Sequence, residues 1–202
     1  MNIIIVVSTL LAVGYYFVVG PDPVGVSANE TFCFFTTDSN LLVALTSLLM
    51  LMYNFRNIEP PAWIMKLRLM GVAAVSLTIV TVLVFLTWFD YCRGGAKLAL
   101  ALYQGNCFVM HIITPLLAIV SFTVLERRPR LAKVDALWGM LPMAIYAVVY
   151  LCLVVAGVWE DWYGFTFGGR YWLTAVLLIA MNLATYAIAV ALCALREKNK
   201  QL

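Results

Sequence analysis

The chain has 202 residues, of which 64% are hydrophobic and only 11% are charged, and its formal net charge is +3. Its mean hydropathy of +0.97 lies well outside the usual balance of a soluble domain, so the composition indicates an integral membrane protein. The small positive charge does not indicate nucleic-acid binding, because the basic loops of a membrane protein account for it.

Six apolar segments have the length of about 20 residues that crosses a bilayer core of roughly 30 Å. In chain order they are 2–20, 33–55, 68–89, 98–125, 134–158 and 171–195. Because the connections are short, neighbouring segments are predicted to pack antiparallel. The sequence therefore predicts an all-α integral membrane protein, with one domain of six transmembrane helices over residues 1–202.

The first segment also has features of a signal peptide, since Val26, Ser27 and Ala28 resemble a cleavage site. However, no Lys or Arg precedes the apolar stretch, and the stretch is long for a signal core. We therefore expect a retained helix.

The second segment begins with a polar cluster, which comprises Thr36, Thr37, Asp38, Ser39 and Asn40. If this stretch is helical, spacings of three and four residues place Thr36, Ser39 and Asn40 on one face. Alternatively, Asp38 caps the helix, and both threonines then precede its first turn.

The fourth segment carries the only histidine of the chain, His111. Burying a charged imidazole in hydrocarbon is expensive, so a histidine at this position indicates a function. Gln104, Cys107 and Thr114 follow the same helical spacing and form a polar stripe with it, and Asn106 lies beside the stripe.

Pro115 follows this stripe. Because proline lacks an N–H, it cannot donate to the carbonyl four residues earlier, which belongs to His111. We therefore expect a kink that frees the carbonyl of His111. On the sixth segment, Asn182 is predicted either to face the same cavity or to join helices by hydrogen bonds.

The basic residues predict the orientation, because cytoplasmic loops carry an excess of Lys and Arg. Ten of the thirteen follow the second, fourth and sixth segments: Arg56, Lys66, Arg68, Arg127, Arg128, Arg130, Lys133, Arg196, Lys198 and Lys200. Acidic Asp22 and Glu30 are among the residues of the opposite loops. Both termini are therefore predicted to be cytoplasmic.

The five cysteines show no metal-binding spacing. With a single histidine in the chain, we expect no metal site and no cofactor. Cys33 and Cys92 both fall near the predicted outer face, where an oxidising compartment permits a disulfide. The sequence leaves that pairing open.

A threonine and a histidine facing one cavity support nucleophilic acyl transfer, because a neutral imidazole can remove the hydroxyl proton. In this interpretation Thr36 is the nucleophile, and Asn40 or Asn106 holds the imidazole or donates to the oxyanion. The competing class is a noncatalytic membrane protein, such as a small transporter or a lipid-binding scaffold. There His111 relays protons or joins helices.

Several short motifs resemble a known family. They are Phe35 to Leu41, Asn106 with His111 before Pro115, and the run Trp162, Tyr163, Gly164 and Phe165. The chain resembles the androgen-induced and androgen-dependent six-helix proteins, which are intramembrane threonine hydrolases of fatty acid esters of hydroxy fatty acids. It is most similar to their bacterial members.

The resemblance implies Thr36 as nucleophile, His111 as base, and a membrane lipid or fatty acid ester as substrate. It also implies a multi-pass protein of the bacterial inner (plasma) membrane, while the oligomeric state stays open. The eukaryotic pattern, with Asp or Asn three residues after the threonine, selects Thr37 and Asn40 instead. Gly164 stands where the family tends to have proline.

Overall fold

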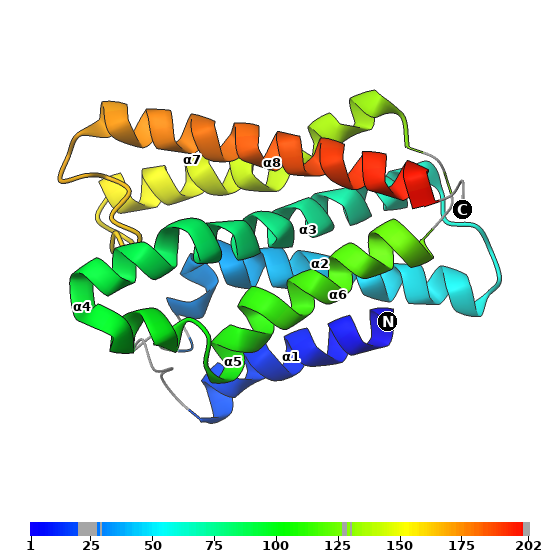
Figure 1. The fold of residues 1–202 in the computed structure, drawn as a ribbon, viewed down its shortest axis with the longest axis horizontal. Coiled ribbons are helices and arrows are strands. Elements are labelled where there is room, and N and C mark those ends of the chain that lie inside the picture. The colour runs from blue at the N-terminus through cyan, green and yellow to red at the C-terminus, as the bar shows by residue number, and fades with distance from the viewer. Residues whose placement is uncertain (20–27, 29, 127–128, 130, 200–202) are drawn as a thin grey trace.

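A computed structural model describes residues 1–19, 28, 30–126, 129 and 131–199. Every regular element in these residues is a helix, so the all-α prediction is confirmed. Among them, five helical segments are long and apolar enough to cross a membrane, and α1 (Asn2–Val18) is a shorter apolar helix. Figure 1 shows the helices lying side by side along the long axis of a bundle.

The remaining elements, in chain order, are η1 (Glu30–Cys33), α2 (Phe35–Phe55), α3 (Ala62–Thr81), η2 (Val82–Leu86), α4 (Thr87–Ala101), α5 (Gly105–Phe108), η3 (Val109–Ile113), α6 (Thr114–Val120), η4 (Ser121–Leu125), η5 (Lys133–Met140), α7 (Leu141–Val155) and α8 (Tyr171–Asn199). The turns η2, η3 and η4 are π-helical, whereas η1 and η5 are 3-10 helices.

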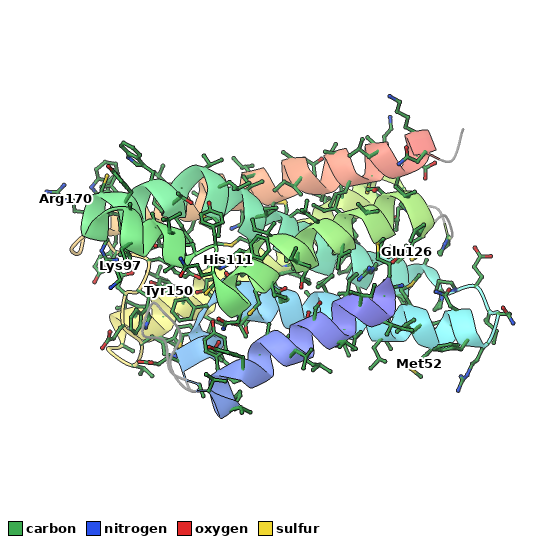
Figure 2. All side chains as sticks on the ribbon, turned by 60° about the horizontal axis from the view of Figure 1, so that its bottom comes forward. Met52, Lys97, His111, Glu126, Tyr150 and Arg170 are labelled. Atoms are coloured by element: carbon green, nitrogen blue, oxygen red, sulfur yellow. The ribbon has the colours of Figure 1, made fainter. Side chains whose placement is uncertain are left out.

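The start of α1 and the end of α8 lie at one end of the bundle, which we call the terminal end (Figure 1). The turn between α2 and α3 also lies there, and Glu126 is near it, whereas Lys97 and Arg170 lie at the opposite end (Figure 2). Arg127, Arg128, Arg130 and Lys200, which contributed to the predicted orientation, are outside the described residues, as are Asp22, Val26 and Ser27.

The predicted boundary between the third and fourth segments is wrong. The elements α3, η2 and α4 follow one another from Ala62 to Ala101 with no loop residue between them. The next helix begins at Gly105 rather than at residue 98. The chain reverses within α4, where Gly95 has φ 71° and ψ −166°. Only glycine adopts this conformation readily, and apolar residues continue on both sides of it, so hydropathy alone does not reveal the turn.

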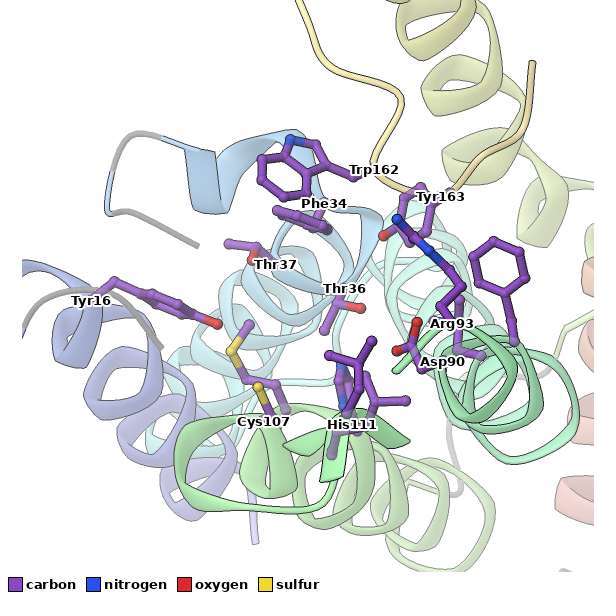
Figure 3. A pocket seen from close by; sticks show the side chains of 15 residues that line it. Tyr16, Phe34, Thr36, Thr37, Asp90, Arg93, Cys107, His111, Trp162 and Tyr163 are labelled. Carbon is purple, nitrogen blue, oxygen red and sulfur yellow. Dashed lines mark hydrogen bonds between the residues drawn. The ribbon is translucent and has the colours of Figure 1, made fainter. Parts of the chain in front are cut away.

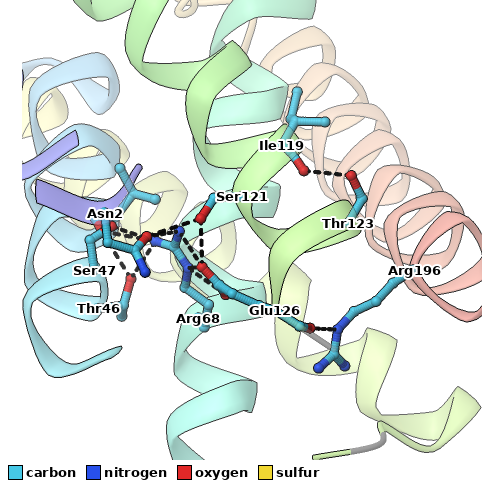
Figure 4. A network of polar contacts seen from close by, with 10 residues as sticks. Asn2, Thr46, Ser47, Arg68, Ile119, Ser121, Thr123, Glu126 and Arg196 are labelled. Carbon is cyan, nitrogen blue, oxygen red and sulfur yellow. Dashed lines mark hydrogen bonds and ion pairs between the residues drawn. The ribbon is translucent and has the colours of Figure 1, made fainter. Parts of the chain in front are cut away.

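The interpretation of Arg68 as a loop charge is also wrong. Arg68 lies inside α3 and is fully buried, where its guanidinium contacts the Glu126 carboxylate at 3.0 Å. Its Nη1 donates to Ser47 of α2 at 2.7 Å, and its Nη2 donates to Asn2 of α1 at 3.0 Å (Figure 4). This ion pair joins three helices and the end of η4 near the terminal end.

Arg196 was likewise predicted to be a loop charge, but it belongs to α8 and is 1% exposed. Its Nε donates to the main-chain oxygen of Glu126 at 2.6 Å (Figure 4). Its Nη2 donates to the carbonyl of Pro129 at 2.9 Å. Both buried arginines therefore bind the segment that follows η4. A charge that is buried in this way needs such partners, because its desolvation is otherwise uncompensated.

Candidate functional site

A cavity of about 240 Å³ opens at the end of the bundle opposite the termini. Most of the side chains that line it are apolar, and they include Phe34, Leu86, Phe89, Leu98, Leu102, Met110 and Trp162. The lining also includes Thr36, Thr37, Asp90, Arg93, Cys107, His111 and Tyr163. A largely apolar cavity with a few polar groups is the usual form of a site for a small or lipid-like ligand.

The cavity places Thr36 and His111 on facing walls (Figure 3). Thr36 comes from the first turn of α2 and is half-buried, whereas His111 comes from the middle of the π-turn η3 and is 7% exposed. Two residues that are 75 positions apart in the chain thus share one hollow. A hydroxyl and an imidazole in this arrangement can serve as nucleophile and base.

The imidazole of His111 is oriented by the main chain. Its Nδ1 lies 2.8 Å from the carbonyl oxygen of Leu102, at the end of α4. A carbonyl only accepts, so Nδ1 carries the proton of the neutral ring and donates it, and the lone pair is then on Nε2. The carbonyl of Leu102, rather than the predicted Asn40 or Asn106, therefore holds Nδ1 of the imidazole.

The π-turn changes which carbonyl the proline frees. The N–H of Thr114 bonds to the carbonyl of Val109, five residues back, so in the same register the partner that Pro115 lacks is Met110 rather than His111. The side-chain amide of Asn40 supplies the missing donor, with Nδ2 3.0 Å from the carbonyl oxygen of Met110. The predicted freed carbonyl is therefore corrected from His111 to Met110.

Asn40 also donates from Nδ2 to the carbonyl oxygen of Thr36, at 2.7 Å. Its amide hydrogens are thus occupied by the main chains of α2 and η3, which leaves no donor for an oxyanion. Asn40 instead fixes the turn of Thr36 against the turn of His111. The predicted oxyanion role of Asn40 is wrong, and a positioning role replaces it.

The two candidate threonines differ in their partners. Thr37 is buried, and its hydroxyl lies 3.2 Å from the hydroxyl of Thr31 in η1. The side chain of Thr36 is instead half-buried and lines the cavity together with Tyr163. Helix α2 begins at Phe35, so both threonines are inside its first turn, and the alternative in which Asp38 caps the helix is wrong.

The other predicted site residues do not line the cavity. Ser39 bonds to Thr78 of α3 at 3.2 Å, and Thr114 lies 3.4 Å from Ser8 of α1. Asn182 donates to its own helix, from Nδ2 to the carbonyl of Leu178 at 2.9 Å. These side chains join helices or stabilise a helix locally.

Two residues around the start of α5 also differ from the prediction. Gln104 is exposed and extended at the N-cap of α5, so it does not belong to a helical stripe with His111. Asn106 is 5% exposed, and neither polar atom of its side chain has a hydrogen-bond partner among the described residues. The turn after Ala101 displaces Gln104 from the predicted stripe, whereas Asn106 is on the helical stretch that continues to His111.

The loop between α7 and α8 contributes residues for which the sequence analysis proposed no chemical role. Tyr163 stacks on Phe165 with 4.8 Å between ring centroids and contacts Phe34 edge-on. Asp161 organises the same loop by accepting hydrogen bonds from Tyr150 at 2.6 Å and from the N–H groups of Phe165 and Thr166 at 2.8 and 2.9 Å. The aspartate followed by a Trp-Tyr-Gly-Phe run is the sequence signal that could have indicated this loop.

Partial burial raises the pKa of Asp161, but the hydrogen bonds from Thr166, Tyr150 and Phe165 outweigh it and bring the pKa below its ordinary value of 3.8. A carboxylate with a lowered pKa stabilises the fold above its unfolded-state pKa, and that stabilisation is lost as the pH falls through the folded-state pKa. Asp161→Asn should lower Tm by about 3 °C or more at pH 7. Thermal unfolding in detergent between pH 3 and 7 checks this.

The gap in Tm between the wild type and Asp161→Asn should narrow as the pH falls below 3.8, because Asp161 then gains a proton in the unfolded state first and in the folded state at its lower pKa. Asp90→Asn is the matched control, since this acidic residue lies at the same end of the bundle but outside the loop. A gap that stayed constant down to pH 3 would contradict the stated role of the carboxylate.

Asp90 and Arg93, on successive turns of α4, form the charged part of the cavity wall (Figure 3). The guanidinium of Arg93 also lies over the ring of Phe89, at 5.3 Å. Cys33 and Cys92 are both free thiols, so the structure contains no disulfide between them.

Neither a protein-family model nor a curated protein nor a solved structure matches the chain.

Proposed function

We propose that this membrane protein is a hydrolase of lipid esters, with Thr36 as nucleophile and His111 as general base. One observation carries the proposal: Thr36 and His111 line one largely apolar cavity, and Leu102 holds Nδ1 of the imidazole. A cavity of this character between apolar helices suits an acyl chain, which can enter sideways from the bilayer.

The reaction follows from the two groups. Nε2 of His111 takes the hydroxyl proton as the oxygen of Thr36 attacks the ester carbonyl, and the tetrahedral intermediate then expels the alcohol, which receives that proton. Water attacks the resulting acyl-threonine, gives its proton to His111, and releases the fatty acid. The threonine oxygen leaves with that proton, so the enzyme returns to its starting state.

The resemblance to the androgen-induced and androgen-dependent family supports fatty acid esters of hydroxy fatty acids, or similar lipids, as substrates. The same proposal includes six membrane crossings, cytoplasmic termini and a bacterial inner membrane. Helix α1 then provides the sixth crossing, although it has only 17 residues. The start of α1 and the end of α8 lie at the same end of the bundle, which is compatible with an even number of crossings (Figure 1).

Two contacts support Thr36 over Thr37 as the nucleophile. The hydroxyl of Thr37 bonds to that of Thr31 and is buried, whereas Thr36 is half-buried and lines the cavity with Tyr163. An attacking hydroxyl must reach both its base and the ester carbonyl, which favours the residue that is open to the cavity.

Labelling with a hydroxyl-reactive fluorophosphonate tests the assignment. Thr36→Ala should abolish labelling and lower kcat by about a thousandfold or more, because it removes the nucleophile. Thr37→Val should still be labelled at Thr36, as peptide mass spectrometry can show. Thr123→Val is the matched control, because Thr123 bonds to Ile119 at the terminal end, far from the cavity in the fold.

Full hydrolysis by Thr36→Ala would overturn the proposal. Loss of labelling only in Thr37→Val would instead make Thr37 the nucleophile. A wild-type protein that neither reacts with the probe nor hydrolyses esters would favour the noncatalytic alternative, a transporter or lipid-binding scaffold in which His111 joins helices.

A further inference from the structure

Tyr163, in the loop between α7 and α8, brings a phenol to the candidate nucleophile. Tyr163 and Thr36 line two neighbouring cavities together, and the second of these is also lined by Phe35 and Tyr146. Tyr163 lines the same cavity as Thr36 and His111 (Figure 3). The side chain thus lies where an ester carbonyl must approach Thr36.

Ester hydrolysis requires a donor at this position. When the threonine oxygen attacks, the carbonyl π electrons move to oxygen, and the resulting oxyanion is stabilised by donors that already point toward it. The amide of Asn40 does not fulfil this role, because it donates to the carbonyls of Thr36 and Met110. His111 is assigned to proton transfer. The hydroxyl of Thr37 bonds to that of Thr31, whereas Tyr163 accompanies Thr36 in both neighbouring cavities.

We propose that the O–H of Tyr163 donates a hydrogen bond to the oxyanion formed at the ester carbonyl during attack by Thr36. This inference rests on the proposed function, since it assigns a further catalytic residue to the same reaction. No bond to Tyr163 forms or breaks. Its hydrogen bond strengthens as negative charge develops on the carbonyl oxygen and weakens again when the carbonyl reforms.

The surroundings keep Tyr163 protonated. Burial raises the pKa of Tyr163 above its ordinary value of 10.0, so the hydroxyl remains a neutral donor at physiological pH. A phenol in this state can donate to an oxyanion without first losing a proton. The N-terminus of α2, beside Phe35, adds the positive end of a helix dipole to the same region.

The loop holds the phenol rigidly, as an oxyanion donor requires. Phe165 stacks on the ring of Tyr163, and Phe34 meets it edge-on. Asp161 ties the backbone on the far side of the loop through Phe165 and Thr166. Because the donor is fixed before the substrate binds, little reorganisation is needed when charge develops.

Tyr163→Phe tests the proposal, since it removes only the hydroxyl. We expect kcat for a lipid ester to fall by about 10²–10³-fold, the effect of removing one oxyanion donor, with KM changed less than about threefold. The rate of labelling by the fluorophosphonate should fall in parallel, because the phosphonyl oxygen occupies the same position. Peptide mapping should still find the label on Thr36.

Tyr150→Phe is the structural control. Tyr150 anchors Asp161 through its hydroxyl at 2.6 Å, but it does not line the cavity. Its loss should lower Tm at least as much as Tyr163→Phe does, while kcat stays within about threefold of the wild type. This comparison separates an effect on the reaction from a loosened loop.

Wild-type kcat in Tyr163→Phe would overturn the oxyanion role and leave the proposed function intact, provided that Thr36 is labelled. Equal losses of kcat in Tyr163→Phe and Tyr150→Phe would also overturn it, because a structural role then explains both. Retained turnover in Thr36→Ala would instead contradict the proposed function on which the inference rests.

Discussion

His111→Gln should lower kcat for ester hydrolysis by about 10²–10⁴-fold, because glutamine keeps an N–H donor for the carbonyl of Leu102 but has no basic nitrogen. The loss should appear in single-turnover acylation as well as in steady-state turnover, since the base acts when Thr36 attacks. Burst-phase kinetics with a chromogenic ester in detergent micelles or liposomes can measure both.

A second variant separates lost chemistry from lost folding. His111→Ala leaves space in the cavity wall, so added imidazole should restore part of the acylation rate without changing Tm. Tm of both variants should stay within a few degrees of the wild type. Unchanged acylation in His111→Gln, with folding intact, would show that this histidine is not the base.

Glu126→Ala should destabilise the fold by about 3–5 kcal/mol, because it leaves the fully buried guanidinium of Arg68 without its carboxylate. For a domain of this size, that corresponds to a fall in Tm of about 6 °C or more. Thermal unfolding of the purified protein in detergent measures the change. The effect should be largely independent of salt, since the pair is shielded from solvent.

Lys66→Met is the matched control, because Lys66 forms an ion pair from α3, the helix that also carries Arg68. Lys66 pairs with Asp135 at 3.0 Å, but its side chain is 33% exposed, so the expected change is only about 0–1 kcal/mol. The double variant Arg68→Met with Glu126→Met should recover much of the loss, because it removes both buried charges. Equal destabilisation by Lys66→Met and Glu126→Ala would contradict the distinction between the two pairs.

Helix content and approximate helix positions followed from hydropathy, because apolar length is a local property of the chain. The start of α2 was predicted within two residues, at 33 against the observed Phe35. The boundary near residue 98 failed because the turn depends on the backbone of Gly95, inside a stretch that is otherwise suitable for a helix. Hydropathy averaged over neighbouring residues does not reveal a positive φ at a single glycine.

For the site, the sequence identified Thr36 and His111 as the unusual polar groups of two apolar segments, and the structure brings them to one cavity. The hydrogen-bond partners that the sequence predicted around these two residues were wrong. The orientation of His111 by Leu102 involves a main-chain carbonyl, and a residue type does not reveal such a partner. The role of Asn40 likewise depends on a π-turn that pairs it with Met110.

The sequence by itself determined that the chain is helical, strongly apolar and equipped with one histidine beside a proline, since composition and spacing are local. Only the tertiary structure decided which polar groups meet. It placed Arg68 against Glu126 rather than in a loop, and it placed Tyr163 and Thr36, 127 positions apart in the chain, in the lining of one cavity. Such contacts depend on how helices pack, and packing depends on the shapes and hydrogen-bonding needs of the whole bundle.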